Sequence, residues 1–572
     1  MIYTKFLIDY FSIVLVLLVC ITIFIGYGQA LLCSFKLQSP ILSTDSLWIG
    51  FCFTFFFIEV THLILPINNK FSLFYFSVGC LFTFYFNSLK SITLIHINII
   101  KIYFIKKNTF YSLLFFILIS LMMLKAMESP SNYDSGLYHL NSIRWINEFA
   151  VIPGIGNIHP RLAFNQSWFG LAALLNITPL FNYGYAVIGL LLLIMSFIQI
   201  TDNKLLFKLQ GHSLFNLILI LTLIINLKQI SSPTPDLAIN ILEIIVTFYL
   251  LQLVQIDKSD VSLIKRKFLV LVVLSITIVT IKLSGLVFSL FCILLGIYLT
   301  YNLIPLKVAL GYLIIFSFFI GLPHILTGYL LSGVPLFPST IAGIWSFDWA
   351  MTSDSLQNLT RWIYCWARAP GEACMSSLDN WKWIPHWVSR FPLDKTIILI
   401  SSIIMLFSSV IYNLQNPNKK ITQIGLCTLP CLTSIVFWFF TAPDPRFLNS
   451  IPSILLALSI LILLNQIPEN KFFILINHSY KLYLFLIILF TTRYTVLSKE
   501  NLFSSLQTGF QLIKSAPLEI KYTNTGLKVY VPMDGDQCHD SPLPCTPYFD
   551  SNLRFIDNRD GVPKLFYTLK NN

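Results

Sequence analysis

The residues best suited to chemistry in this sequence are three aspartates in short motifs that contain proline or glycine. They are Asp134 in YDSGLYH, Asp236 in SSPTPD and Asp444 in APDPRF. A carboxylate can accept a proton from an attacking hydroxyl, and a cation can stabilise the charge that develops on a departing phosphate. Together with nearby cations, the aspartates are suited to group transfer from a lipid phosphate. The cations are Lys282, Arg446, Arg144, Arg161 and Arg368.

Asp134 lies in a polar and aromatic segment, Met127 to Trp168, between long apolar runs. This segment gathers ionisable residues in a chain that is only 11% charged. Because charges are scarce, their clustering indicates function. The alternative is an ordinary extramembrane loop with a solvated amphipathic helix. Asp134 is our catalytic candidate, because Ser131 or Asn132 could supply any helix cap that its surroundings need.

The other two aspartates have structural alternatives. Asp236 follows Pro235 at the head of an expected helix, where a carboxylate caps free N–H groups, so capping and function are equally supported. Asp444 precedes Pro445 and could also begin a helix. Arg446 could then simply pair with Asp444.

The remaining ionisable candidates also have plain structural roles available. Lys282 could extend to the membrane interface instead of contacting a phosphate. Arg144 and Glu148 are four residues apart on an expected helix and could form only a surface pair. His139 and His159 could be ligands, but a lone histidine is more often structural. No tight histidine cluster supports a metal site.

The composition is that of a membrane protein. The chain has 572 residues, of which 56% are hydrophobic and 15% aromatic, and its mean hydropathy is +0.75. Many apolar runs approach the roughly 20 residues that cross a bilayer as a helix. The net charge of +12 is spread largely over short loops. This pattern is typical of cytoplasmic loops and argues against a nucleic-acid partner. We therefore predict an all-α polytopic membrane protein.

About fourteen apolar runs have the length of a spanning helix. A shorter stretch, 91–105, is placed at the cytoplasmic surface, with a fifteenth span as the alternative. If the helices alternate, the lysine-rich loops share one side, which is then the cytoplasm. This alternation requires a hairpin that turns at Lys282 to Gly285. The expected helices are 10–33, 46–66, 71–87, 110–126, 180–200, 213–230, 236–255, 267–282, 285–302, 308–331, 395–413, 421–441, 448–465 and 480–497.

The same alternation places the aspartate segments, a tryptophan-rich loop and the C-terminal tail on the outer face. We expect added N-terminal helices at 1–109 and a transmembrane domain at 110–498 with outer loops at 127–179 and 332–394. An extracytoplasmic cap is expected at 499–572, where alternating residues predict a few short strands.

Aromatic and cysteine residues are distinctive features of the outer segments. Five tryptophans lie between 362 and 387, and their rings suit the membrane interface or the face of a sugar. Of eleven cysteines, seven lie in or near apolar helices, where cysteine behaves as a buried hydrophobe. The other four form close pairs without further zinc ligands, and an oxidising compartment would permit two disulfides. The pairs are Cys365 with Cys374 and Cys538 with Cys545.

The motifs YDSGLYH, SSPTPD, KLSG, GVPLFPS, WARAPG and APDPRF resemble those of largely uncharacterised bacterial multi-pass proteins that are similar to C-type glycosyltransferases. Those enzymes take a sugar from a polyprenyl-phosphate donor on the outer face of the membrane. An acidic residue in their first large outer loop acts as catalytic base or binds the acceptor. Asp134, shortly after the expected helix at 110–126, matches that placement. Ser135 stands where that class has a second acid.

The resemblance, over roughly 110–572, implies an inverting glycosyltransferase in a bacterial inner membrane, with its active site on the periplasmic face. Asp134 would deprotonate the acceptor hydroxyl, while Arg446 and Lys282 stabilise the departing lipid phosphate. The acceptor would be a cell-surface polysaccharide, a lipid or a protein. We expect no cofactor, and a divalent metal is an unsupported alternative. The expected substrate-binding residues are Tyr133, His139, Asp236, Lys282, Arg368, Asp444 and Arg446.

Two other functions stay open at the level of the sequence. A polymerase or ligase of lipid-linked glycans would use its arginines more heavily than a base. A polytopic transporter belongs to a different class. It is disfavoured because the ionisable residues concentrate at one face, whereas transporter sites lie near the midplane of the membrane.

Overall fold

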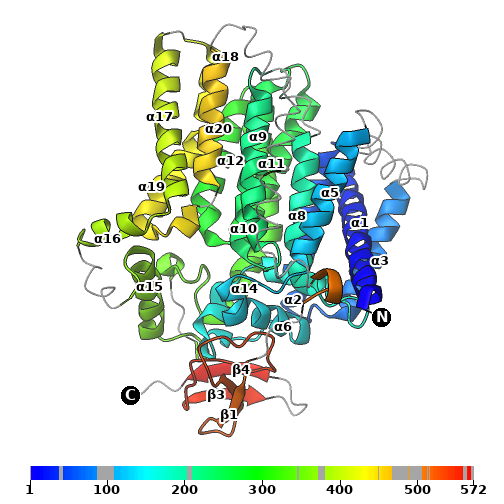
Figure 1. The fold of residues 1–572 in the computed structure, drawn as a ribbon, viewed down its shortest axis with the longest axis vertical. Coiled ribbons are helices and arrows are strands. Elements are labelled where there is room, and N and C mark those ends of the chain that lie inside the picture. The colour runs from blue at the N-terminus through cyan, green and yellow to red at the C-terminus, as the bar shows by residue number, and fades with distance from the viewer. Residues whose placement is uncertain are drawn as a thin grey trace.

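A computed structural model shows a bundle of long helices with short helices and four strands at one end (Figure 1). The long helices follow the apolar runs, because a spanning segment must satisfy its backbone hydrogen bonds internally. The structure describes residues 2–37, 43–86, 109–201, 206, 209–343, 347–371, 380–415, 417–448, 450–466, 489, 505–511, 513, 516–557 and 563–568.

The bundle is made of helices that lie between residues 2 and 464. A π-helical turn, η7 (Ser317–Gly321), joins α13 to α14. The bundle helices are α1 (Ile2–Ser34), α2 (Thr44–His62), α3 (Asn69–Phe86), α5 (Thr109–Ala126), α8 (Gly184–Thr201), α9 (His212–Ile225), α10 (Pro235–Gln255), α11 (Val261–Ile281), α12 (Leu286–Thr300), α13 (Leu306–Phe316), α14 (Leu322–Ser332), α17 (Leu393–Gln415), α18 (Lys419–Leu426), α19 (Leu429–Thr441) and α20 (Ile451–Leu464).

Nine helical segments within the described residues are long and apolar enough to cross a membrane. Shorter apolar helices at Ile117–Ala126 and Gly184–Ile200 accompany them. The prediction of a helical, multi-pass membrane protein is therefore confirmed. The count of about fourteen spans stays a prediction. The stretch 91–105 lies outside the described residues, as does 480–497 apart from residue 489.

The chain turns back on itself after α11, as the distribution of lysines required. Lys282 leaves the helix in an extended conformation, and a short 3-10 helix, η6 (Leu283–Gly285), leads into α12. The two helices pack closely, because a Cβ atom on Gly296 would lie 2.4 Å from the Leu271 side chain. The predicted hairpin is confirmed, and it places Lys282 at the end of the bundle that also holds Asp236.

The N-terminal helices pack into the bundle. Helix α2 contacts α7 (Trp168–Leu174), α11 and α14. Asp45 on α2 is fully buried and accepts hydrogen bonds from Arg266 Nε at 2.8 Å and Lys267 Nζ at 2.6 Å. Lower on the same helix, Glu59 Oε1 lies 3.2 Å from His324 Nδ1 on α14. These polar contacts fix α2 against the central helices, so it forms part of the wall around the site.

Short elements between α5 and α8 cover one end of the bundle (Figure 1). The strands lie beyond them at the same end and form two antiparallel hairpins, β1 with β2 and β3 with β4. The predicted short strands of the tail are thus present. The short elements are η1 (Ser135–His139), α6 (Leu140–Glu148), η2 (Ile155–Asn157), η3 (Pro160–Phe164) and α7 (Trp168–Leu174); the strands are β1 (Leu518–Tyr522), β2 (Lys528–Pro532), β3 (Leu553–Asp557) and β4 (Pro563–Thr568).

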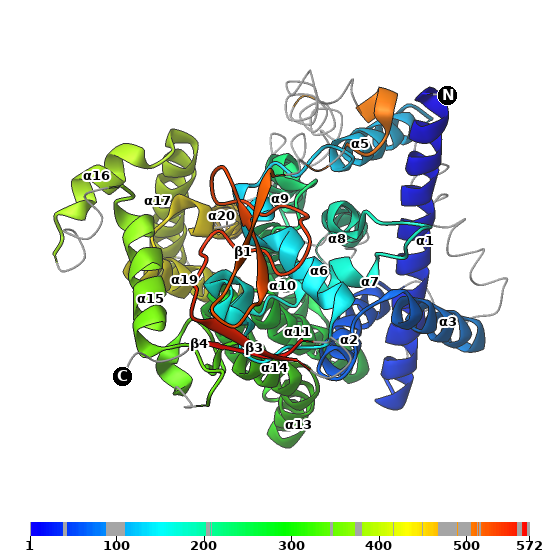
Figure 2. The ribbon, with the colours of Figure 1, turned by 90° about the horizontal axis from the view of Figure 1, so that it is seen from below.

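The tryptophan-rich segment folds into two helices, α15 (Ser353–Arg368) and α16 (Trp383–Arg390). Seen from the end that carries the strands, they lie at one side of the molecule (Figure 2). Trp387 donates a hydrogen bond from Nε1 to the carbonyl of Pro443, and its ring lies 5.9 Å from that of Trp438. The aromatic residues therefore hold α16 against the end of α19, close to the APDPRF motif.

Candidate functional site

Asp134 lies at the centre of a charged cluster at the end of the bundle. Its Oδ1 accepts a hydrogen bond from Arg161 at 3.0 Å, and its Oδ2 accepts one from Arg446, also at 3.0 Å. The Asp134 side chain is 16% exposed, whereas those of Arg161 and Arg446 are 36% and 39% exposed. The two guanidinium groups thus hold the carboxylate between them and keep part of their surface open to a ligand.

A second carboxylate completes the cluster. Asp236 accepts a hydrogen bond from Lys282 Nζ through Oδ1, and its Oδ2 lies 3.9 Å from Arg446 Nε. Arg446 therefore stands between the two aspartates. The ring of Phe447 lies beneath both cations, 4.4 Å from Lys282 Nζ and 4.8 Å from the Arg446 guanidinium carbon. Three cations thus meet at two carboxylates, and their N–H groups are donors that suit an anionic ligand.

Hydrogen bonds between two loops set the position of Asp134. The backbone N–H groups of Ser131 and Asn132 both donate to Ser232 Oγ, at 2.9 and 3.0 Å. Ser231 Oγ in turn donates to the carbonyl of Ser129 at 3.1 Å. The polar residues of SSPTPD therefore hold the YDSGLYH loop beside the start of α10. This explains why Asp134 and Asp236 meet although 102 residues separate them.

The APDPRF motif places Arg446 through local contacts. Asp444 Oδ1 accepts a hydrogen bond from the Arg446 backbone N–H at 2.7 Å. Trp438 Nε1 donates to the Asp444 carbonyl at 2.8 Å. The capping role that the sequence allowed for Asp444 is therefore the one seen in the structure. Its side chain binds the backbone of Arg446 and so stabilises the turn.

The structure brings together four of the residues singled out in the sequence, Asp134, Asp236, Lys282 and Arg446. Arg368 lies elsewhere: it is buried and donates hydrogen bonds to the carbonyls of Tyr364, Phe440 and Thr441. These bonds tie the end of α15 to the end of α19.

Arg161 is a full member of the cluster that sequence analysis named only as a nearby cation. It lies on the 3-10 helix η3, which begins at Pro160. Its backbone N–H donates to Nδ1 of His159 at 3.0 Å, which caps the helix. The sequence offered only a local feature, the residues His-Pro-Arg, which indicate the start of a short helix. Nothing in that feature shows that the turn faces Asp134.

Tyr133 and His139 lie in the same loop as Asp134, and no hydrogen bond joins either side chain to the Asp134 carboxylate in the described part of the chain. The Tyr133 hydroxyl donates to Asp536 of the C-terminal segment, and this bond raises the pKa of Tyr133 to about 12. His139 is 1% exposed, and its ring lies 5.1 Å from the ring of Phe169. Burial lowers the pKa of His139 to about 4, so the imidazole is neutral at pH 7.

The C-terminal segment holds the YDSGLYH loop from outside. Gln537 Nε2 donates to the Tyr133 carbonyl, and the His539 N–H donates to the Gly136 carbonyl, both at 2.7 Å. A Cβ atom on Gly136 would lie 2.7 Å from the His539 ring, so the close approach requires glycine. The disulfide between Cys538 and Cys545 closes this stretch, as predicted. Cys365 is also disulfide-bonded, while its expected partner Cys374 lies outside the described residues.

Removing the disulfide is expected to loosen the YDSGLYH loop. Replacing Cys538 and Cys545 together by serine frees the short loop that they close, at a cost of about 2 kcal/mol. Amide hydrogen exchange should then rise in 533–546 and in 133–137, because Gln537 and His539 hold the second segment. Replacing Cys33, a free cysteine on α1, by serine should change neither segment. Equal exchange in the double variant and the parent would contradict this role.

The stability of this region is expected to fall in acid. His159 is 2% exposed, and burial, followed by the charge of Arg161, lowers its pKa to about 3. An unfolded histidine titrates near pH 6.5, so only the unfolded chain gains a proton between these values. The contribution of His159 is complete above about pH 6.5 and declines toward pH 3, by up to about 2 kcal/mol at pH 5.

A thermal unfolding series measures this effect. The unfolding midpoint of the parent should fall between pH 7 and pH 5. His159→Asn keeps a side-chain acceptor for the Arg161 N–H but cannot titrate, so its midpoint should fall less over the same range. If the variant has the same slope as the parent, the acid sensitivity belongs to other groups.

The apolar helices and the cluster at their end define a multi-pass helical membrane protein with a charged site at one end of its bundle. Within the described residues, no three His, Cys, Asp or Glu residues gather as metal ligands would.

The chain belongs to the family described as a domain of unknown function, DUF8201, whose model matches residues 11–452. Neither the comparison with curated proteins nor that with solved structures gives a match. The match includes α2 and all five residues of the cluster, and it ends within α20. The strands of the C-terminal segment lie beyond the matched range.

Proposed function

We propose that the protein is a membrane glycosyltransferase that moves a sugar from a polyprenyl-phosphate donor to a hydroxyl-bearing acceptor. The acceptor is a cell-surface glycan, a lipid or a protein at the outer face of a bacterial inner membrane. One observation carries this proposal: Asp134 is held between Arg161 and Arg446 at the end of the bundle, with Asp236 and Lys282 directly behind. The cluster combines a carboxylate that can accept a proton with three cations that can bind a phosphate.

The arrangement supports an exchange of partners as the donor binds. Arg446 and Arg161 both bind the negatively charged Asp134. A lipid phosphate is also negatively charged, so it competes with Asp134 for both guanidinium groups. Asp236 keeps Lys282 and one side of Arg446 in place during this exchange. A carboxylate oxygen of Asp134 then becomes available to an acceptor hydroxyl.

The chemical step follows from these positions. The acceptor oxygen attacks the anomeric carbon from the face opposite the phosphate, and its proton passes to Asp134. The bond between the anomeric carbon and the phosphate oxygen breaks, and the electron pair leaves with the lipid phosphate. Arg446 and Lys282 stabilise that charge. The products are an inverted glycoside, a lipid phosphate and a protonated Asp134, which returns its proton to water.

Transfer of a radiolabelled sugar tests the proposal. Purified protein in nanodiscs is incubated with polyprenyl monophosphate donors that carry different sugars, and with hydroxyl-bearing glycan and lipid acceptors. Label should move to an acceptor with inversion at the anomeric carbon. Transfer only from lipid diphosphate glycans would replace the proposal by a polymerase or ligase, which the two arginines on Asp134 would also suit. Uptake of a solute into sealed vesicles without any transfer would favour the transporter.

A further inference from the structure

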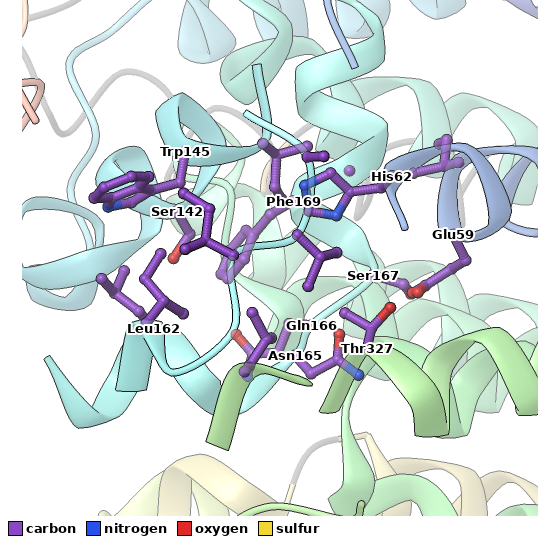
Figure 3. A pocket seen from close by; sticks show the side chains of 18 of the residues that line it. Glu59, His62, Ser142, Trp145, Leu162, Asn165, Gln166, Ser167, Phe169 and Thr327 are labelled. Atoms are coloured by element: carbon purple, nitrogen blue, oxygen red, sulfur yellow. The ribbon is translucent and has the colours of Figure 1, made fainter. Parts of the chain in front are cut away.

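A cavity of about 60 Å³ lies beside the charged cluster. It is partly open and is lined by α2, α6, α7 and α14 and by parts of the segment 150–167. In the view of Figure 3, Asn165, Gln166 and Thr327 stand on one side of the cavity and His62 faces them from the other. Arg161 is one of the lining residues of the cavity and its side chain also binds Asp134, so this residue belongs to both places.

Polar atoms of the cavity wall are left without a hydrogen-bond partner in the described structure. They are Oγ1 of Thr327 and Oε1 of Gln166. Thr327 is 3% exposed. Burying a polar group without a partner is unfavourable. A wall that holds two such groups is therefore suited to a ligand that supplies hydrogen bonds.

The polar and apolar groups that line the cavity indicate which kind of ligand fits it. Its unpartnered groups are a hydroxyl, which can both donate and accept, and an amide oxygen, which accepts, and both are neutral. Glu59 adds a carboxylate that is 4% exposed, and a buried negative charge repels an anion. Ile58 and Phe169 provide apolar surface between the polar groups. This mixture matches a neutral ring that bears hydroxyl groups, whose faces are apolar and whose edge is polar.

We propose that this cavity is the subsite for the sugar of the lipid-linked donor, an inference that rests on the proposed function. Arg161 sets the geometry: with the donor phosphate against Arg161 and Arg446, the attached sugar extends toward Gln166 and Thr327. The cavity has room for about five water-sized groups. The hydroxyl-bearing edge of the ring therefore enters, while the anomeric carbon stays outside, beside Asp134.

Binding measurements with a matched pair of probes test the subsite. The probes are farnesyl phosphate and farnesyl phosphate that carries glucose, galactose, mannose or arabinose, with the protein in nanodiscs. For the parent, at least one sugar should raise the affinity above that of farnesyl phosphate alone. Thr327→Val and Gln166→Leu each remove one hydrogen bond at nearly constant volume. Each should reduce that gain about tenfold and leave the affinity for farnesyl phosphate unchanged.

A buried threonine elsewhere provides the control. Thr247 on α10 is 1% exposed and donates from Oγ1 to the Glu243 carbonyl at 2.9 Å. Thr247→Val makes the same chemical change away from the cavity and should keep the full gain from the sugar. Thermal unfolding of all three variants shows whether each is folded.

The possible outcomes test the sugar subsite and the proposed function separately. If both cavity variants keep the gain from the sugar, or if the parent shows none, the cavity holds only water and the inference is overturned. Sugar transfer by the parent would still support the glycosyltransferase in that case. Absence of both transfer and any sugar-dependent affinity would overturn the two together.

Discussion

Asp134→Asn should lower the rate of sugar transfer by about a thousandfold, the scale of a lost general base. The asparagine oxygen still accepts a hydrogen bond from one arginine, so the loops around it keep their positions. It cannot take the proton of the acceptor hydroxyl, and it no longer balances the charges of Arg161 and Arg446. Initial rates of transfer by parent and variant in nanodiscs, at saturating donor, measure the effect on the chemical step.

A matched aspartate at the same end of the molecule serves as the control. Asp540 has a side chain that is 51% exposed and lies 3.7 Å from Arg144 NH1. Asp540→Asn should transfer sugar at the rate of the parent. Equal rates for parent and Asp134→Asn would move the base to another residue, and Asp236→Asn would then be the next variant to assay.

Arg446→Met should produce a loss of about a hundredfold to a thousandfold, the range for removing one donor that stabilises a developing charge. Arg446 contacts Asp134 and approaches Asp236, and it lies beside Lys282 over the ring of Phe447. Its removal deprives the departing phosphate of a cation and leaves Asp134 with Arg161 alone. Both the KM for the donor and the turnover should worsen.

Arg446→Lys separates the charge from the shape of the side chain. Lysine keeps the positive charge but cannot bridge two carboxylates with a planar fork, so partial activity is expected. Arg144→Met is the matched control, because Arg144 pairs with Glu148 on the surface of α6 and with Asp540. A donor KM that is unchanged in Arg446→Met would contradict a contact between this arginine and the phosphate.

Much of the architecture follows from properties that are local in the sequence. The apolar runs predict the helices, and the distribution of lysines predicts the turn at Lys282. The motif residues Asp134, Asp236 and Arg446 stand where apolar runs end, and helix ends in the same layer of a bundle meet. Their proximity is therefore a consequence of topology that the sequence pattern can reveal.

The positions of Arg161 and Arg368 could not be predicted from local features of the sequence. Both are arginines inside the polar segments between apolar runs, and no local feature distinguishes them. Arg161 reaches Asp134 because η3 turns it toward the first loop, whereas Arg368 donates to carbonyls left free at two helix ends. These outcomes depend on how distant segments pack. The cavity beside Arg161 is likewise formed by segments that are far apart in the chain, namely α2, the stretch from α6 to α7, and α14.

The surroundings of Asp134 join parts of the chain that are made at very different times. Its contact with Arg446 spans 312 residues, and the bond from Gln537 to Tyr133 spans 404. A ribosome that has just completed the YDSGLYH loop has yet to make most of the residues that hold it. During synthesis, Asp134 is therefore made before both arginines and before the C-terminal segment that holds its loop. A chain halted before residue 446 contains the acid without its site, so the bundle gains its charged cluster only late in biogenesis.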